Sequence, residues 1–262
     1  MSNLIPVVEI FGPTIQGEGP LIGTPCHFIR FGGCDFKCGW SEKDKRWVTD
    51  GFVCDSLHAV LPSEVRKAER LDAHTIVDRV RALPGNPGWV VLSGGNPLLH
   101  DLSEVVSGLH YKGFKVSVET QGSLYKEWLK NVDQIVISPK PPSSQMEGTL
   151  KLLGQFLDQF GILHPPMVLK VPILDERDLD FARNIVQVSR LPLYLSVTNV
   201  HGGMGVPDAE DPGEARWWAD TTEELLERFR WIHAKASLDP LLSRAVILPQ
   251  LHVLVWGNAR GR

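Results

Sequence analysis

Residues 89–97 read WVVLSGGNP, a run of strand-forming residues that stops at a serine, two glycines, an asparagine and a proline. Three further segments have the same plan: FKVSVETQG at 114–122, QIVISPKPP at 134–142 and LYLSVTN at 193–199. β-Branched and aromatic residues favour strands, and glycine and proline end them. Segments of helical periodicity separate the runs, so the sequence predicts βα units and a mostly parallel sheet.

Other segments extend this α/β prediction. A helix is expected over 71–83, where apolar residues share one stripe and Asp72 is the expected N-cap. A second helix is expected to end at Gly113, and residues of about 200–220 are expected to form a long loop. The remaining expected elements are strands at 7–11, 26–31, 168–173 and 245–248 and a helix within 175–190.

The polar motifs SGGNP, ETQG, SPKPP and SVTN all lie where an expected strand ends. In parallel α/β folds, ligands bind at the edge formed by the carboxyl ends of the strands. Any one of these motifs alone would be interpreted as a turn. Four of them at one edge indicate a shared binding site.

Composition narrows the function classes. The 262-residue chain has a net charge of -4 and a pI of about 6.1, so it has no overall basic field and nucleic-acid binding is disfavoured. The N-terminal residues lack a signal-peptide pattern, and no window of 18 consecutive apolar residues is present. We therefore expect a cytoplasmic protein without membrane attachment.

Three of the four cysteines fall within residues 32–62, GGCDFKCGWSEKDKRWVTDGFVCDSLHAVLP, with spacing C-x3-C-x15-C. Clustered cysteines in a reducing compartment indicate metal or redox chemistry rather than disulfides. Three thiolates can hold three irons of a [4Fe–4S] cube and leave the fourth iron open. On spacing alone, the same cysteines could bind zinc together with a histidine such as His58.

Several separated motifs resemble those of the 7-carboxy-7-deazaguanine synthases, which are radical S-adenosylmethionine enzymes. They are EIFGPTIQGEG, FIRFGGCDFKCGW, CDS, LSGGNP, ETQG, ISPKPPSS and LPQLHVLVWGN, and they cover the chain nearly from end to end. The resemblance implies a single domain over residues 1–262 with a partial, modified βα barrel. It also implies that residues 41–53 are an insertion, because Ser41 stands where the family has its third cysteine.

The resemblance implies a [4Fe–4S] cluster whose open iron binds S-adenosylmethionine. Reductive cleavage of that cofactor gives a 5′-deoxyadenosyl radical, which takes a hydrogen from C6 of 6-carboxy-5,6,7,8-tetrahydropterin. The ring contracts, ammonia leaves and 7-carboxy-7-deazaguanine forms, assisted by Mg²⁺. The resemblance also implies an electron donor such as flavodoxin or ferredoxin, and a homodimer. The cofactor and the cluster are expected to carry the catalysis, without a catalytic side chain.

By the same resemblance, Cys34, Cys38 and Cys54 are the expected cluster ligands, and Ser56 is the expected magnesium ligand, with Asp55 nearby. Cys26, in an apolar strand, is expected to be a core residue. The expected cofactor-binding residues are Val53, Asp55, Gly95, Glu119, Ser138, Pro139, Lys140, Ser196, Val197, Thr198 and Asn199. The expected substrate-binding residues are Ile15, Gln16, Gly17, Glu18, Arg30, Ser93, Gln250 and His252.

Several of these positions have a simpler structural interpretation. Arg30 could form only a surface salt bridge, and Glu119 could be a structural carboxylate. Gln250 and His252 are expected to reach the substrate from the last strand, although a lone histidine in an apolar run could also be a core residue. Asn96 departs from the acid often found at its position in the family, which leaves its role open. Two alternative functions remain at this point: an activating enzyme that makes a radical on a partner protein, and a zinc-stapled binding module without catalysis.

Overall fold

The computed structural model describes residues 4–41, 46–47, 54–160, 165–200, 212–257 and 261. The strands are β1 (Ile5–Ile15), β2 (Pro25–Phe31), β3 (Trp40–Ser41), β4 (Arg46–Trp47), β5 (Glu69–Leu71), β6 (Trp89–Gly94), β7 (Lys115–Thr120), β8 (Gln134–Ile137), β9 (Met167–Ile173), β10 (Leu193–Val197) and β11 (Val246–Leu248). The α-helices are α1 (Leu57–Val60), α2 (Pro62–Val65), α3 (Ala73–Arg81), α4 (Ser103–Tyr111), α5 (Thr149–Leu157), α6 (Glu176–Val188), α7 (Pro212–Ala236) and α8 (Leu251–Trp256). Short 3₁₀ turns are η1 (Gly19–Leu21), η2 (Pro97–Leu99), η3 (Glu127–Asn131) and η4 (Pro142–Ser144).

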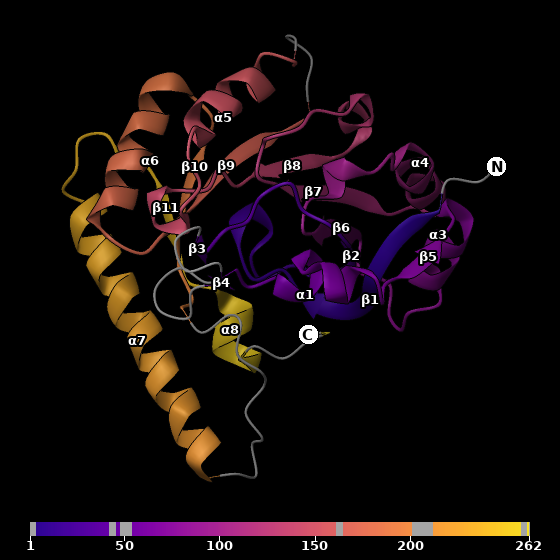
Figure 1. Cartoon of the computed structure of the whole chain (residues 1–262), viewed down its shortest axis with the longest axis horizontal. Helices are drawn as coiled ribbons and strands as arrows, with labels where there is room; N and C mark the ends of the chain where they lie inside the picture. Colours follow the sequence, from indigo (N-terminus) through magenta and orange to yellow (C-terminus); the bar gives the residue numbers. More distant parts are fainter. Residues whose placement is uncertain are drawn as a thin grey trace.

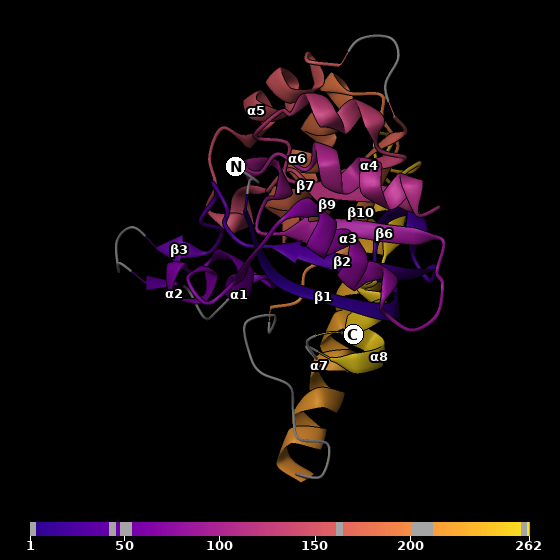
Figure 2. The same ribbon diagram turned by 90° about the vertical axis from the view of Figure 1, so that its right-hand side faces the viewer.

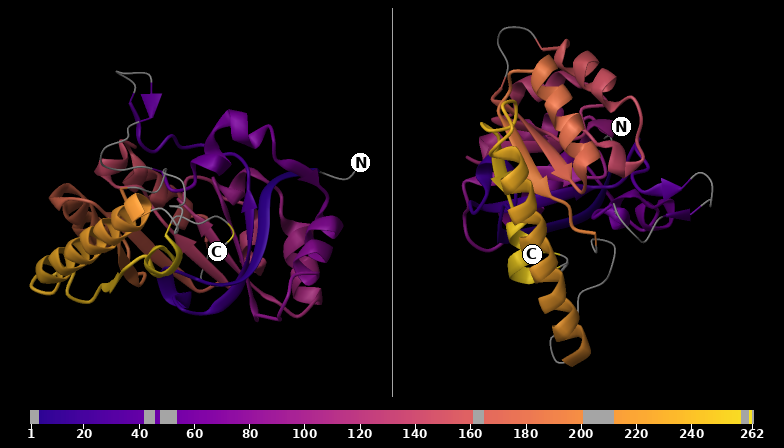
Figure 3. Two further views of the ribbon diagram at one scale, coloured as in Figure 1. Left: turned by 90° about the horizontal axis from the view of Figure 1, so that it is seen from below. Right: turned by 90° about the vertical axis from the view of Figure 1, so that its left-hand side faces the viewer.

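One 9-stranded sheet organises the chain, in the order β11-β10-β9-β8-β7-β6-β2-β1-β5 (Figure 1). Every pairing from β2 to β11 along this order is parallel, whereas β1 runs antiparallel to β2 and β5. Within the described residues the edge strands β11 and β5 do not pair with each other, so the sheet stays open. This curved, open sheet confirms the partial βα barrel (Figure 3).

Helices α4, α5 and α6 cover one face of the sheet, and α8 lies on the other side (Figure 2). Strand residues alternate between these faces. In β9, Leu169, Val171 and Ile173 enter the main hydrophobic core beneath the helices, so Lys170 and Pro172 point to the opposite face. That second face carries the polar side chains described below.

Two helix signals in the sequence are confirmed. The Asp72 carboxylate caps α3 by accepting a hydrogen bond from the Thr75 amide at 2.8 Å. Gly113 follows α4 with φ of 87°, the left-handed conformation that glycine adopts at low cost. Among the helices that the structure describes, none combines the length and apolarity needed to cross a lipid bilayer.

Two boundaries differ from the sequence-based prediction. The expected loop at about 200–220 is wrong from Pro212 onward, where the long helix α7 begins and projects away from the sheet (Figure 1). Proline is tolerated in the first turn of a helix because that turn needs no backbone donor. Residues 201–211 lie outside the described part of the chain. Gln250 and His252 do not extend the last strand, because Gln250 occupies the N-cap position of α8 and His252 lies within that helix.

The segment expected as an insertion begins with a small antiparallel pair. Trp40 pairs with Trp47 and Ser41 with Arg46, forming a two-stranded sheet separate from the main one (Figure 2). Residues 42–45 and 48–53 lie outside the described part, and with them the expected cofactor contact Val53.

Candidate active site

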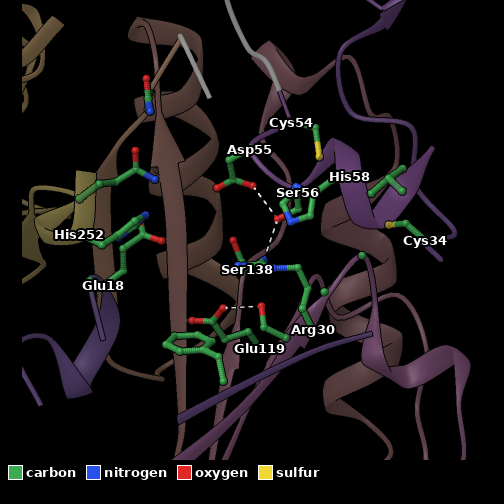
Figure 4. Close-up of a pocket in the computed structure, with 18 of the residues that line it drawn as sticks. Glu18, Arg30, Cys34, Cys54, Asp55, Ser56, His58, Glu119, Ser138 and His252 are labelled. Carbon is green, nitrogen blue, oxygen red and sulfur yellow. Dashed lines mark hydrogen bonds between the residues drawn. The ribbon is translucent and has the colours of Figure 1, made fainter. Parts of the chain in front are cut away.

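A cavity opens at the carboxyl ends of the parallel strands, on the face away from the main core (Figure 4). The four polar motifs that follow β6, β7, β8 and β10 contribute to its walls and to an adjoining cavity. The walls are completed by the loop after β1, the cysteine-bearing loop and α8. The structure therefore brings together at one edge the segments that sequence patterns had marked as a shared site.

Cys34, Cys38 and Cys54 all line this cavity. They pack with Phe36 in a small apolar cluster. Cys26 lies elsewhere, fully buried in β2 beside Phe28 and Val91. The chain thus places three thiols from one loop around one space and keeps the fourth in a hydrophobic core.

This arrangement fits an iron–sulfur cube better than a zinc ion. Within the described residues, no three side chains of the types His, Cys, Asp and Glu converge closely enough to hold one metal ion. In a cube each thiolate binds a different iron, so the sulfurs stand at separate corners. His58, the candidate fourth zinc ligand, instead lies 3.3 Å from Glu9 Oε1 through its Nε2.

Burial raises the pKa of all three thiols, to about 11 for Cys38. The Lys140 ammonium opposes the shift at each of them, and it also lies 3.2 Å from Ser138 Oγ. Without metal the thiols therefore stay protonated, and binding iron must displace their protons. Lys140 is placed to balance negative charge that develops there.

The adjoining cavity has an unfilled hydrogen-bonding capacity. It is lined by Pro172, Ser196 and Thr198, and it shares the rest of its lining with the first cavity, including Cys38, Cys54, Asp55, Ser138, Lys140, Asn199 and Gln250. Thr198 Oγ1 and Gln250 Oε1 are both buried and accept or donate no hydrogen bond within the described chain. Buried polar atoms rarely stay without a partner, so these two atoms fit a polar ligand such as S-adenosylmethionine.

Other residues expected at the cofactor take different places. Gly95 and Glu119 line the first cavity, whereas the side chain of Val197 belongs to the main hydrophobic core. Pro139 is buried between Ser138 and Lys140. A Cβ on Gly95 would lie 2.1 Å from Gly33 O, so only glycine allows β6 to approach the cysteine-bearing loop this closely.

On the substrate side, Glu119 joins two of the expected contact residues. Its Oε1 accepts a hydrogen bond from Gln16 Nε2 at 3.0 Å, and its Oε2 accepts one from Ser93 Oγ at 3.0 Å. Gln16 also accepts the Gly17 amide through Oε1 at 2.7 Å. These bonds fix the end of β1 at Ile15, and the loop that follows it, against the ends of β6 and β7.

The QGEG segment is held from the other side by α8. Leu251 N donates to Gly17 O at 3.0 Å, and a Cβ on Gly17 would lie 1.8 Å from His252 Nδ1. The His252 ring therefore packs directly on this loop. Burial lowers the pKa of His252 although Glu18 acts to raise it, so the ring is neutral near pH 7.

Arg30 reaches the cavity from β2 and is anchored by Glu9. Its Nε donates to Glu9 Oε1 at 2.6 Å and its Nη1 donates to Ser56 Oγ at 3.3 Å. Ser56 Oγ in turn donates to Asp55 Oδ1 at 3.1 Å (Figure 4). Burial acts to raise the pKa of Glu9, but His58 and Arg30 outweigh it and lower the pKa to about 2, so this ion pair persists.

Asn96 lines neither cavity and is fully buried. Its Nδ2 donates to Asp35 Oδ1 at 2.8 Å, and its Oδ1 accepts from Thr120 Oγ1 at 3.0 Å. Gln121 Nε2 donates to the same Asp35 oxygen at 2.6 Å. Asn96 therefore ties the segment between Cys34 and Cys38 to the ends of β6 and β7.

Sequence reasoning did not single out Lys170 or Glu9. Lys170 lies in β9, and its Nζ donates to Glu18 Oε2 at 2.6 Å inside the cavity. A lone lysine within the apolar run VLKVPI was the available signal, since charged residues are seldom buried without a partner. Glu9 carried no comparable signal, because polar residues are common in a strand with one exposed face.

Comparisons with known proteins identify the family of the chain. The chain is 36% identical over 260 residues to the 7-carboxy-7-deazaguanine synthase of Bacillus cereus, covering 98% of each chain. It is 34% identical over 266 residues to that of Bacillus subtilis, covering 100% of each, and 31% identical over 179 residues to that of Escherichia coli, covering 65% of this chain and 76% of the relative. No family model matches the chain.

A solved structure described as QueE from Escherichia coli has the same fold, with a TM-score of 0.52, 19% identity and 95% of each chain covered. At that identity the likeness establishes the fold alone, while the full-length sequence relatives establish the family. The chain belongs to the 7-carboxy-7-deazaguanine synthase family of radical S-adenosylmethionine enzymes.

Proposed function

We propose that this enzyme converts 6-carboxy-5,6,7,8-tetrahydropterin into 7-carboxy-7-deazaguanine with release of ammonia, in queuosine and 7-deazapurine biosynthesis. The full-length relatives bear the name of that activity. The observation that carries the proposal is the gathering of three cysteines at one end of a cavity whose other walls carry the residues expected to bind a pterin.

When bound, the cluster and S-adenosylmethionine supply a carbon radical that abstracts hydrogen from the substrate. The chain's own residues bind and orient the reactants. Cys34, Cys38 and Cys54 would hold three irons, and Lys140 would balance charge beside them. Thr198 would offer its unpartnered oxygen to the cofactor, with Ser196 and Asn199 on the same side of the site. Gln250, which the resemblance assigns to the substrate, lines both cavities, and its unpartnered Oε1 could serve either ligand.

For the substrate, we propose that the Arg30 guanidinium binds the carboxylate. Its Nε is occupied by Glu9, so the ion pair fixes the plane of the guanidinium and leaves the Nη end toward the cavity. A planar fork suits a carboxylate better than a point charge does. Gln16, Glu18 and Ser93 then face the ring system, with Glu119 holding two of them in place.

We further propose a magnesium ion at Ser56. Its hydroxyl lies beside Asp55 and the Arg30 head, where the substrate carboxylate would arrive. Magnesium prefers oxygen ligands and keeps several waters, so a hydroxyl, a substrate carboxylate and waters form a suitable set.

The remaining expectations extend this proposal. A low-potential donor such as flavodoxin or ferredoxin would reduce the cluster, and the enzyme would act as a homodimer. A cytoplasmic location suits the proposal, since a reducing compartment keeps cluster thiols available.

The test is an anaerobic reaction with reconstituted enzyme, dithionite, S-adenosylmethionine, Mg²⁺ and the carboxytetrahydropterin. We expect 7-carboxy-7-deazaguanine and ammonia in equal amounts, identified by mass spectrometry and an ammonia assay. Protein that carries a full cluster and cleaves S-adenosylmethionine, yet leaves the pterin unchanged, would refute the proposed substrate.

A further inference from the structure

Lys170 is a buried cation in the active site to which no role has been given so far. It is 8% exposed, and it lines both the substrate cavity and the adjoining cofactor cavity. Its neighbours Leu169 and Val171 face the hydrophobic core, so the alternation of β9 sends the Lys170 side chain into the site.

Glu18 is the direct partner of Lys170. The side chains of both are 11% exposed, and Lys170 Nζ donates to Glu18 Oε2 at 2.6 Å. The other oxygen, Oε1, accepts no hydrogen bond from the part of the chain that the structure describes. An ionised carboxylate accepts several hydrogen bonds, so Glu18 keeps capacity for a ligand on the cavity side.

A buried carboxylate needs a nearby cation to stay ionised. Burial acts to raise the pKa of Glu18, and the Lys170 and His252 side chains outweigh it and lower the pKa. Asp55, in the loop after Cys54, is the third charged group that faces Glu18. Because burial lowers the pKa of His252, Lys170 is the permanent cation of this group.

We propose that Lys170 is a positioning residue for substrate recognition, keeping Glu18 ionised and aimed at the N–H donors of the pyrimidine edge of the pterin. A 2-amino-4-oxopyrimidine presents an amino N–H and a ring N–H side by side, which a carboxylate can accept together. Lys170 thereby sets the preference for an amino-bearing ring. This inference rests on the proposed function, because it assigns Glu18 to the pterin.

The experiment is a double-variant cycle on reconstituted enzyme. Lys170→Met removes the charge at similar length, and we expect KM for the carboxytetrahydropterin to rise at least about 30-fold, the lower range for breaking a buried ion pair. The iron content should be unchanged. Lys170→Arg, which keeps the cation, should recover most of the affinity, and surface Lys115→Met serves as the matched control with no effect.

Glu18→Gln then separates positioning from a structural role. If Lys170 acts through Glu18, adding Lys170→Met to Glu18→Gln should cost less than about threefold more in KM, because coupled residues are not additive. The proposal would be overturned if the increases in KM caused by Lys170→Met and by Glu18→Gln multiplied in the double variant. An unchanged KM in Lys170→Met, or a loss of cluster that parallels the loss of activity, would also overturn it.

The pH profile gives a second readout. In the wild-type enzyme the pKa of Glu18 is low, so this carboxylate stays ionised between about pH 6 and 8. Its ionisation should therefore not change KM over that range. Without Lys170, burial raises the pKa of Glu18, so the KM of Lys170→Met should fall as pH rises across that range. A flat profile in Lys170→Met, with a raised KM, would contradict the role assigned to Glu18 ionisation.

Equilibrium binding of 7-carboxy-7-deazaguanine, which keeps the amino-bearing edge, provides a measurement without turnover. Wild type should bind it more tightly than the analogue with oxygen in place of the amino group, and Lys170→Met should lose that preference. If Lys170→Met fails to fold, the paired variant Glu18→Gln with Lys170→Gln is compared with Glu18→Gln alone by the same criterion. Wild-type enzyme that cannot convert the pterin would refute the proposed function, whereas active wild type with an unaffected Lys170→Met refutes only this inference.

Discussion

Exchanging Asn96 for aspartate tests whether this residue positions the cysteine-bearing loop or contacts the cofactor. Asn96 Nδ2 lies 2.8 Å from Asp35 Oδ1, so Asn96→Asp replaces a donor with a charged oxygen at nearly the same position. The change preserves shape and volume. Any large effect therefore comes from charge and lost hydrogen bonding.

The expected magnitude follows from these contacts. Two charges about 4 Å apart at an effective dielectric constant of about 20 repel by about 4 kcal/mol. Asp35 is exposed, so screening by solvent reduces this to about 2 kcal/mol. The lost hydrogen bond to a charged partner adds about 1.5 kcal/mol. A total of about 3 to 4 kcal/mol corresponds to a fall in Tm of about 6 to 15 °C for a chain of this size.

The assay is thermal unfolding of the metal-free protein, followed by circular dichroism, together with iron content after reconstitution. A reversed pair is the decisive control: Asn96→Asp combined with Asp35→Asn restores one donor and one acceptor across the same gap, and should recover most of the lost stability. Asn96→Asp with wild-type Tm and iron content, but altered affinity for S-adenosylmethionine, would refute the positioning role and favour direct cofactor contact.

Three further outcomes are expected. Arg30→Lys should raise KM for the carboxytetrahydropterin about tenfold or more without changing S-adenosylmethionine affinity, because an ammonium cannot bind Glu9 and a carboxylate as a planar fork; unchanged steady-state kinetics would leave Arg30 a purely structural ion pair. Cys54→Ala should abolish cluster binding, whereas Cys26→Ala should keep it at a stability cost of about 1 to 2 kcal/mol for the core cavity, and iron and sulfide counts on both variants decide the ligand set. Ser56→Ala should weaken the dependence of turnover on Mg²⁺ with the cluster intact, and an identical magnesium titration would remove Ser56 from that site.

The sheet and the position of the site were predictable because both follow from local patterns. Each run that was expected as a strand overlaps a strand of the structure, and the polar motifs at the ends of β6, β7, β8 and β10 meet at one edge because parallel strands align their carboxyl ends. The N-cap at Asp72 and the glycine at 113 were equally local signals. Assigning residues to a pterin or to S-adenosylmethionine, in contrast, needed the family resemblance.

What the sequence did not predict depends on contacts between distant segments. The run LHVLVW is as apolar as a strand, and its short length leaves helix and strand indistinguishable by periodicity. It forms α8 where Leu251 N meets Gly17 O, more than two hundred residues away in the chain. The partner of Lys170 was hidden in the same way, since Glu18 follows β1 whereas Lys170 lies in β9.

The long spacing between Cys38 and Cys54 is compatible with one cluster site because the structure fixes the two halves of the loop independently. The first half is anchored where Gly39 N donates to Ser144 O at 2.9 Å and where Asn96 holds Asp35. The second half is anchored through α1, whose Ala59 O accepts Gly33 N at 2.7 Å. A roughly fivefold longer loop costs only about 1 to 2 kcal/mol in loop-closure entropy. The geometry of the three thiols is therefore set by the anchors, and the length of the chain that joins them is free to vary.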